Sequence, residues 1–100
     1  MEFVLTKKAR SDLIAIAIYT QKQWSREQRN IYLKQLDDAF HALTNNPQAG
    51  KCCDYIRTGY RKLPQGSHVI FYRQLNTAMI EIVRILHKQM DVSSKFNPEP

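Results

Sequence analysis

The chain has 100 residues, 43% of them hydrophobic, and 15 Lys and Arg against 9 Asp and Glu give a formal net charge of +6. This length fits one domain, and the composition excludes a disordered chain. The charge favours an acidic partner, nucleic acid or protein, although a basic surface facing solvent explains it equally well. No apolar run approaches a membrane span, no signal peptide is expected, and the adjacent Cys52 and Cys53 indicate reduced thiols and a cytoplasmic location.

Two helices are predicted after a first short strand over residues 2–6. Thr6 is a candidate N-cap for a helix over about residues 8–22, which shows apolar residues at helical spacing. Ser25, with Gln28 three residues later, begins a second helix that ends near Asn45. Because the connection between the helices is short, we expect an antiparallel helical hairpin.

The spacing of apolar residues then changes from a helical period to a period of two, which predicts strands over residues 55–63, 67–74 and 79–87. Tight connections make these strands an antiparallel meander. The predicted fold class is therefore α+β, a helical hairpin packed on an antiparallel β-sheet in the order β-α-α-β-β-β. Residues 1–92 form the single domain, and residues 93–100 are predicted to be a flexible C-terminal tail.

Both faces of the predicted sheet are apolar at its centre, although one helical hairpin covers only one face. We therefore expect a second cover, which the tail, a partner chain or a substrate would supply. Arginines stand among the apolar residues of the strands, and Arg84 lies within the apolar run at residues 80–86.

The strand arginines allow two interpretations. Arg57, Arg61 and Arg84, with His87 and Lys88, offer cations for RNA cleavage, but no residue spacing supplies a general base and acid. The favoured interpretation is that these arginines bind backbone and carboxylate groups at a partner interface. The three histidines lie on separate elements without metal-ligand spacing, so neither a metal nor a cofactor is predicted.

Ile14 and Ile18 form a second apolar stripe on the first helix, beside Tyr19. This stripe indicates either packing between the two helices or a docking groove for an amphipathic helix of a partner. The spacing favours interhelical packing only slightly.

Several motifs in order along the chain resemble a known family. They are A-R-S-D-L-x-x-I-x-x-Y-T at residues 9–20, G-S-H-V-I-F-Y at residues 66–72, and R-I-L-H-x-x-M-D at residues 84–91. Over residues 3–92 the chain resembles the ParE branch of the ParE/RelE toxin superfamily of bacterial type II toxin-antitoxin systems.

This resemblance implies a helical hairpin on an antiparallel sheet and a small basic toxin, connected with plasmid maintenance. It also implies a hetero-oligomer with a ParD-like antitoxin, which begins with a ribbon-helix-helix domain and folds over the toxin. ParE-type toxins poison DNA gyrase by binding, whereas RelE-type toxins cut messenger RNA on the ribosome. The chain lacks a convincing RelE set of residues, so no catalytic residue and no direct nucleic-acid specificity are expected.

The resemblance, together with the apolar surface, leads to two candidate sets of binding residues. The target-facing set is Arg84, His87, Lys88, Met90 and Asp91. The antitoxin-binding set is Ile14, Ile18, Tyr19, Arg57, Arg61 and Arg73. Arg84 is expected to pair with a carboxylate, such as Asp91 or an acid of the antitoxin. The alternative functions are a RelE-like messenger RNA endoribonuclease and a non-toxic module that binds a partner.

Overall fold

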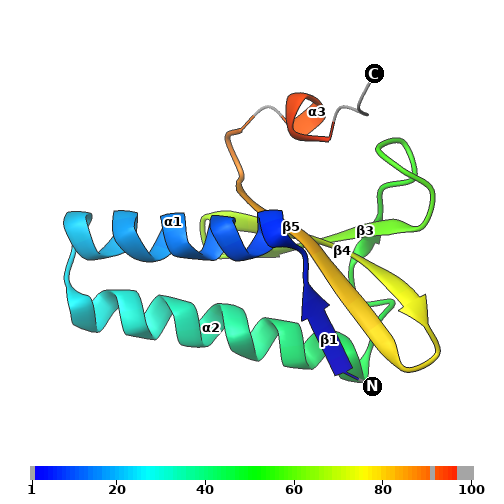
Figure 1. Ribbon diagram of the computed structural model, residues 1–100, viewed down its shortest axis with the longest axis horizontal. Coiled ribbons are helices and arrows are strands. Elements are labelled where there is room, and N and C mark those ends of the chain that lie inside the picture. The colour runs from blue at the N-terminus through cyan, green and yellow to red at the C-terminus, as the bar shows by residue number, and fades with distance from the viewer. Residues whose placement is uncertain (1, 91, 97–100) are drawn as a thin grey trace.

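The computed structural model describes residues 2–90 and 92–96 (Figure 1). Two long helices lie side by side on one face of a sheet, and a short C-terminal helix lies on the other side. The elements in chain order are β1 (Glu2–Leu5), α1 (Lys7–Gln23), α2 (Arg26–Asn45), β2 (Lys51–Cys52), β3 (Tyr60–Gln65), β4 (His68–Asn76), β5 (Met79–His87) and α3 (Val92–Lys95).

The two predicted helix starts are confirmed by their capping bonds. The Thr6 hydroxyl accepts a hydrogen bond from the backbone N–H of Ala9 at 3.0 Å, and it donates one to the Val83 carbonyl at 2.7 Å. The Ser25 hydroxyl accepts from the backbone N–H of Gln28 at 3.0 Å. Thr6 therefore begins α1 and also attaches that beginning to the middle of β5.

The predicted fold class is confirmed, with one difference in the sheet. The strand order is β1-β5-β4-β3-β2, and β3, β4 and β5 form the predicted antiparallel meander. The short strand β2, which was not predicted, adds an antiparallel edge beside β3. However, β1 pairs with β5 in parallel, with Phe3 opposite Ile80, so the sheet is mixed. The helical hairpin carries the chain away from β1, and no tight turn constrains the direction in which β1 joins the sheet edge.

The segment before β3 also differs from the prediction. The strand expected over residues 55–63 begins only at Tyr60, and turns occupy most of residues 54–59. Gly59 has a φ of 88°, and its N–H donates to an Asp54 side-chain oxygen at 2.9 Å, which closes a loop. Arg57 therefore lies on this loop and does not share a strand face with Arg61.

The core has two parts, one on each face of the sheet. The α1–α2 hairpin buries Ile16, Leu36 and Phe40 against Ile70 and Ile82 of the strands. The opposite face carries a smaller cluster, which joins Cys53, Tyr60, Phe71, Val83 and Leu86 to the partly buried Val92 and Phe96.

The C-terminal segment therefore supplies the second cover that the two apolar sheet faces require. The Phe96 ring lies edge-on to Phe71, with centroids 5.0 Å apart, and edge-on to Tyr60 at 5.8 Å. The packed part of the chain thus extends beyond residue 92. Residues 97–100 of the predicted tail lie outside the described residues.

An ion pair joins α1 to β5 at the edge of the helical core. Arg84 donates from Nε to Asp12 Oδ2 at 2.8 Å and from Nη2 to Asp12 Oδ1 at 2.9 Å, and both side chains are only 14% exposed. Asp12 Oδ2 also accepts from the backbone N–H of Ile85 at 3.0 Å. The predicted carboxylate partner of Arg84 is therefore present within the chain, and it is Asp12 of α1. Asp91 lies outside the described residues.

A second polar cluster fastens α2 to the β3–β4 turn. The Tyr32 hydroxyl lies 2.6 Å from His68 Nδ1 and accepts from the Ser67 N–H at 3.1 Å. The rings of His68 and His87 are edge-to-face, with centroids 5.4 Å apart. Burial, and then the neighbouring His87, lower the pKa of His68 below its ordinary value of 6.5, while Asp12 opposes this shift. The Tyr32 hydroxyl also lies 3.1 Å from the Gln65 carbonyl oxygen, so its one proton is donated either to that oxygen or to Nδ1 of a neutral His68, according to the tautomer of the imidazole.

We predict that Arg84→Ala lowers the free energy of unfolding by about 3 kcal/mol, because the Asp12 carboxylate is left in a mostly buried site without its partner. Urea denaturation measures this loss. The matched control is Arg73→Ala, which removes an ion pair with Glu81 whose side chains are 45% and 22% exposed, and which we expect to cost about 1 kcal/mol or less. Equal losses in the two variants would contradict a structural role for the Asp12–Arg84 pair.

We also predict that protonation of His68 destabilises the fold. Because the pKa of His68 is lowered in the folded state, the unfolded chain binds this proton first, and stability falls as the pH decreases below about 6.5. The free energy of unfolding of His68→Asn, which keeps a hydrogen-bond acceptor near Nδ1, should fall less than that of the native chain between neutral and mildly acidic pH. His41→Asn, which removes an exposed imidazole, is the control and should follow the native curve.

Candidate binding sites

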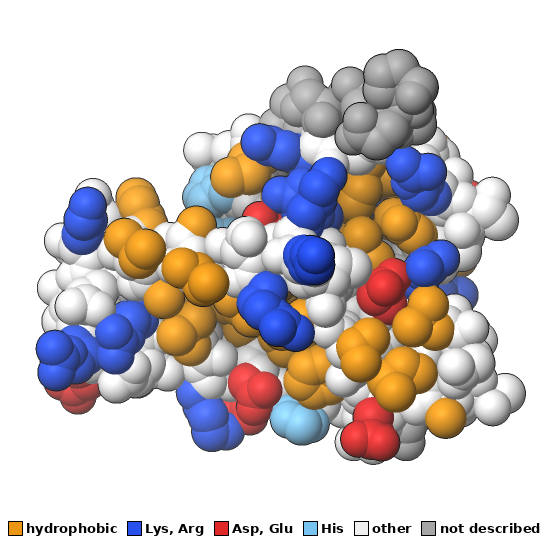
Figure 2. Space-filling view, viewed as in Figure 1, with side chains coloured by type: hydrophobic (Ala, Val, Ile, Leu, Met, Phe, Trp, Pro, Cys, Tyr) orange, Lys and Arg blue, Asp and Glu red, His pale blue; other side chains and the backbone are white. Residues whose placement is uncertain are grey.

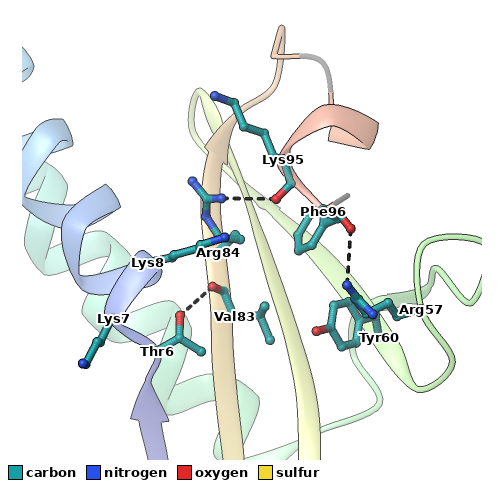
Figure 3. A pocket seen from close by; sticks show the side chains of 9 residues that line it. All are labelled: Thr6, Lys7, Lys8, Arg57, Tyr60, Val83, Arg84, Lys95 and Phe96. Carbon is teal, nitrogen blue, oxygen red and sulfur yellow. Dashed lines mark hydrogen bonds between the residues drawn. The ribbon is translucent and has the colours of Figure 1, made fainter. Parts of the chain in front are cut away.

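A shallow pocket of about 320 Å³ opens where the beginning of α1 meets the second face of the sheet (Figure 3). We call it the basic pocket, because five of its nine lining residues are Lys or Arg and none is acidic. Its lining residues are Thr6, Lys7, Lys8, Arg57, Tyr60, Val83, Arg84, Lys95 and Phe96.

The cations of the basic pocket come from four parts of the chain. Lys7 and Lys8 form the first turn of α1, which contains no acidic residue. Arg57 comes from the loop before β3, Arg84 from β5 and Lys95 from α3. In Figure 3 the Lys8 side chain extends toward Arg84, and the Arg57 guanidinium lies beside Tyr60 and Phe96.

The C-terminal segment is held at this pocket by one ring and two long hydrogen bonds. Arg84 Nη1 lies 3.4 Å from the Lys95 carbonyl oxygen, and Arg57 Nη2 lies 3.4 Å from the Phe96 carbonyl oxygen. Bonds of this length are weak. Most of the attachment therefore comes from the Phe96 ring, which packs on Tyr60 and Phe71.

A second hollow, of about 350 Å³, lies between α1, α2 and β1 on the other face of the sheet. We call it the helical groove. Figure 2 shows hydrophobic side chains gathered along the two helices on this side of the molecule. The lining is apolar except for Asp37 and consists of Phe3, Leu5, Leu13, Ile14, Ala17, Leu33, Asp37 and Phe40.

The second stripe of α1 does not pack between the helices. Ile14 is 59% exposed, Ile18 is 53% exposed and Tyr19 is 63% exposed. The interpretation of this stripe as interhelical packing is therefore wrong. Ile14 lines the helical groove, and the stripe exposes apolar surface to solvent.

The three arginines assigned to antitoxin binding do not lie together with this stripe. Arg57 lines the basic pocket. Arg61 donates from Nη1 to the Gly50 carbonyl at 2.7 Å, and Arg73 pairs with Glu81 at 2.8 Å. The structure thus separates the predicted antitoxin set into an apolar part on α1 and cations at other places.

The predicted target-facing residues are also spread over different surroundings. Arg84 lines the basic pocket and His87 packs against His68. Lys88 and Met90 are exposed just after β5, and Met90 is 45% exposed. The remaining member, Asp91, lies outside the described residues.

Several residues of the basic pocket were not found by sequence reasoning. Lys7, Lys8 and Lys95 provide charge, and Tyr60 and Phe96 provide an aromatic wall. The one available signal was the pair Lys7–Lys8 directly after the N-cap, where the helix dipole favours acidic residues. No comparable signal marked Phe96, whose place depends on how the C-terminal segment folds back.

The basic pocket can stabilise negative charge, but its lining offers no carboxylate, imidazole or thiol as a general base. Cys53 is buried on the same sheet face, and burial raises the pKa of its thiol, which disfavours the reactive thiolate. Among residues 2–90 and 92–96, no three His, Cys, Asp or Glu side chains are grouped to hold a metal ion. In the same ranges, no helix has the length and apolar character needed to cross a membrane.

Comparison with known proteins gives a consistent result at the level of sequence. The family described as "ParE toxin of type II toxin-antitoxin system, parDE" matches residues 3–92. Toxin ParE1 of Mycobacterium tuberculosis is 41% identical over 90 residues, which cover 90% of this chain and 92% of that protein. Toxin ParE1 of Caulobacter vibrioides is 34% identical over 87 residues, which cover 87% of this chain and 88% of that protein.

Solved structures agree with the fold. The chromosomal ParDE system from P. aeruginosa contains a chain with a TM-score of 0.72 and 21% identity, covering 87% of this chain and 95% of that one. The RelBE2 toxin-antitoxin complex from Mycobacterium tuberculosis contains a chain with a TM-score of 0.62 and 22% identity. The match covers 87% of this chain and 96% of that one. The motifs, the family match and the two ParE1 relatives establish that this chain belongs to the ParE toxin family of type II toxin-antitoxin systems.

Proposed function

We propose that this toxin acts in the cytoplasm, that it inhibits DNA gyrase by binding, and that a ParD-like antitoxin neutralises it by occupying the helical groove. The observation that carries the antitoxin site is the exposed apolar stripe beside an apolar groove, with Ile14 59% exposed. The ParE character of the sequence supports the gyrase target.

The helical groove suits an amphipathic helix. Its floor is built from Leu13, Leu33 and Phe40, while Ile14 stands at the side and remains accessible. An amphipathic helix buries an apolar face spaced at i, i+3 and i+4 in such a groove. A disordered antitoxin segment loses conformational entropy when it folds, so it needs a large apolar contact in return.

Inhibition by binding is favoured over RNA cleavage by the chemistry of the basic pocket. A metal-independent ribonuclease needs a group that removes the proton of the attacking hydroxyl. The lining holds no carboxylate or imidazole; the Thr6 hydroxyl is engaged with Val83 and Ala9, and the Tyr60 hydroxyl belongs to a side chain that is only 9% exposed. Charge stabilisation without an accessible carboxylate or imidazole base fits a binding surface better than a ribonuclease centre.

We predict that the purified toxin stops DNA supercoiling by gyrase and causes cleaved DNA to accumulate. A supercoiling assay with increasing toxin measures both products. Adding the antitoxin encoded in the neighbouring reading frame should restore supercoiling. Intact supercoiling at excess toxin would exclude this target, and codon-spaced cuts in translated messages, detected by primer extension, would indicate a ribosome-dependent ribonuclease instead.

We further predict that Ile14→Asp weakens antitoxin binding by about tenfold or more, because a charge placed in an apolar contact loses its hydration. Since Ile14 is exposed, the variant should fold normally and keep its effect on gyrase. Ile31→Asp is the matched control, as Ile31 is 44% exposed on α2 and does not line the groove. Calorimetric titration with the antitoxin measures both affinities, and equal losses would place the antitoxin elsewhere.

A further inference from the structure

We propose that the basic pocket binds a nucleoside phosphate, whose phosphate oxygens contact Lys8, Arg57 and Arg84 and whose base lies against the aromatic wall of Tyr60 and Phe96. The ligand is either a free nucleotide or a nucleotide unit within a nucleic-acid strand. This site shares no lining residue with the helical groove.

The first observation is an excess of positive charge around one hollow. Five cationic side chains line the basic pocket, and within the described residues only Arg84 has a carboxylate partner. Lys7, Lys8, Arg57 and Lys95 form no ion pair in that part of the chain. In Figure 3 the ammonium groups of Lys7 and Lys95 point away from the pocket, whereas the Lys8 side chain extends toward Arg84. Neighbouring like charges repel one another, and an anion that binds between Lys8, Arg57 and Arg84 removes this repulsion.

The second observation is the way in which Arg84 is held. Asp12 occupies its Nε and Nη2, which fixes the guanidinium plane. The remaining nitrogen, Nη1, points to the pocket side, where its contact with the Lys95 carbonyl is 3.4 Å long. A phosphate oxygen makes a shorter, charge-assisted bond with such a donor. Arg84 is thus oriented for an anion before any ligand arrives.

The third observation is that Lys7 and Lys8 stand at an unfavourable place in α1. The N-terminus of a helix carries partial positive charge, so a cation in the first turn is unfavourable there. No acidic residue offsets this cost in the first turn. Residues that break a local rule in this way are expected where a binding site requires them.

The size and walls of the pocket favour a nucleotide over a simple carboxylate. Its volume of about 320 Å³ lies at the lower end of the range for small-molecule sites. The Arg57 fork matches phosphate geometry, and aromatic rings stack on bases of any sequence. Phe96, which is partly buried, offers such a ring at the pocket wall, and the buried Tyr60 packs against it. A single carboxylate would leave most of the surrounding cations unneutralised.

The test measures the affinity of the purified full-length toxin for ATP and for a short single-stranded oligothymidylate by calorimetry at about 0.15 M salt. The pocket variant is Lys8→Gln/Arg57→Gln, and both residues are exposed. The matched control is Lys22→Gln/Arg26→Gln, which removes the same charge from exposed positions at the other end of the helical hairpin. We expect the pocket variant to bind about tenfold or more weakly and the control to bind like the native chain.

Comparing the affinities for ATP and for the oligothymidylate distinguishes a free nucleotide from a nucleic-acid strand as the ligand. Tight binding of ATP alone indicates a free nucleotide. Tighter binding of the oligothymidylate indicates a strand, and the pocket variant should then reduce the salt dependence of log K by about 0.7 for each lost phosphate contact.

Three results would overturn the proposal: no saturable binding of either probe, equal weakening in the control variant, or equal affinity for a polyglutamate peptide. The last result would indicate a site for an acidic protein segment. Neither gyrase nor the antitoxin is present in this assay, so its outcome is independent of the function proposed above.

Discussion

The ion pair between Asp12 and Arg84 determines how the helical hairpin and the sheet are joined. Asp12 binds the side chain of Arg84 and the backbone N–H of Ile85 at once. The carboxylate therefore holds α1 to β5 at a defined position along the strand. The pair is mostly buried, with both side chains 14% exposed. A pair in such a site adds little to net stability when compared with apolar residues, but it penalises any arrangement that separates its members.

The parallel pairing of β1 with β5 determines where α1 begins, and therefore where Lys8 lies in the basic pocket. Because β1 runs beside β5, the chain leaves β1 at Leu5 next to the middle of that strand. Thr6 then caps α1 while its hydroxyl donates to Val83. The first turn of α1 is consequently placed at the edge of the sheet, where Lys8 extends toward Arg84 and both residues line the basic pocket. A strand that joined the sheet in the opposite direction would release the chain at the other end of β5.

Local features were predictable from the sequence, and contacts between distant residues were not. The capping roles of Thr6 and Ser25 follow from short-range chemistry, and the structure confirms both. Arg57 was misplaced because an alternating pattern does not reveal that Gly59 adopts a left-handed conformation and ends the extended chain. The partner of Arg84 was missed because Asp12 lies 72 residues away in sequence.

The exposure of the Ile14 and Ile18 stripe on α1 could not be predicted from the spacing of apolar residues. Helical spacing identified Ile14 and Ile18 as apolar neighbours, but it could not distinguish a packed face from an open one. That distinction depends on how α2 crosses α1, which only the tertiary structure provides. The same limit applies to Phe96, which was assigned to a tail and instead packs on the second sheet face.

The two candidate sites are connected mechanically, because α1 contributes to both. Ile14 lines the helical groove, and Asp12, two residues earlier on the same helix, holds Arg84 at the basic pocket. A partner helix that entered the groove could not shift α1 along β5 without breaking the Asp12–Arg84 pair. If the antitoxin binds as proposed, it enters a largely preformed groove and bears most of the ordering cost of the complex. In the same way, a ligand that tightens the contacts of Arg84 restrains Asp12, so any effect of one site on the other must be reciprocal in binding free energy.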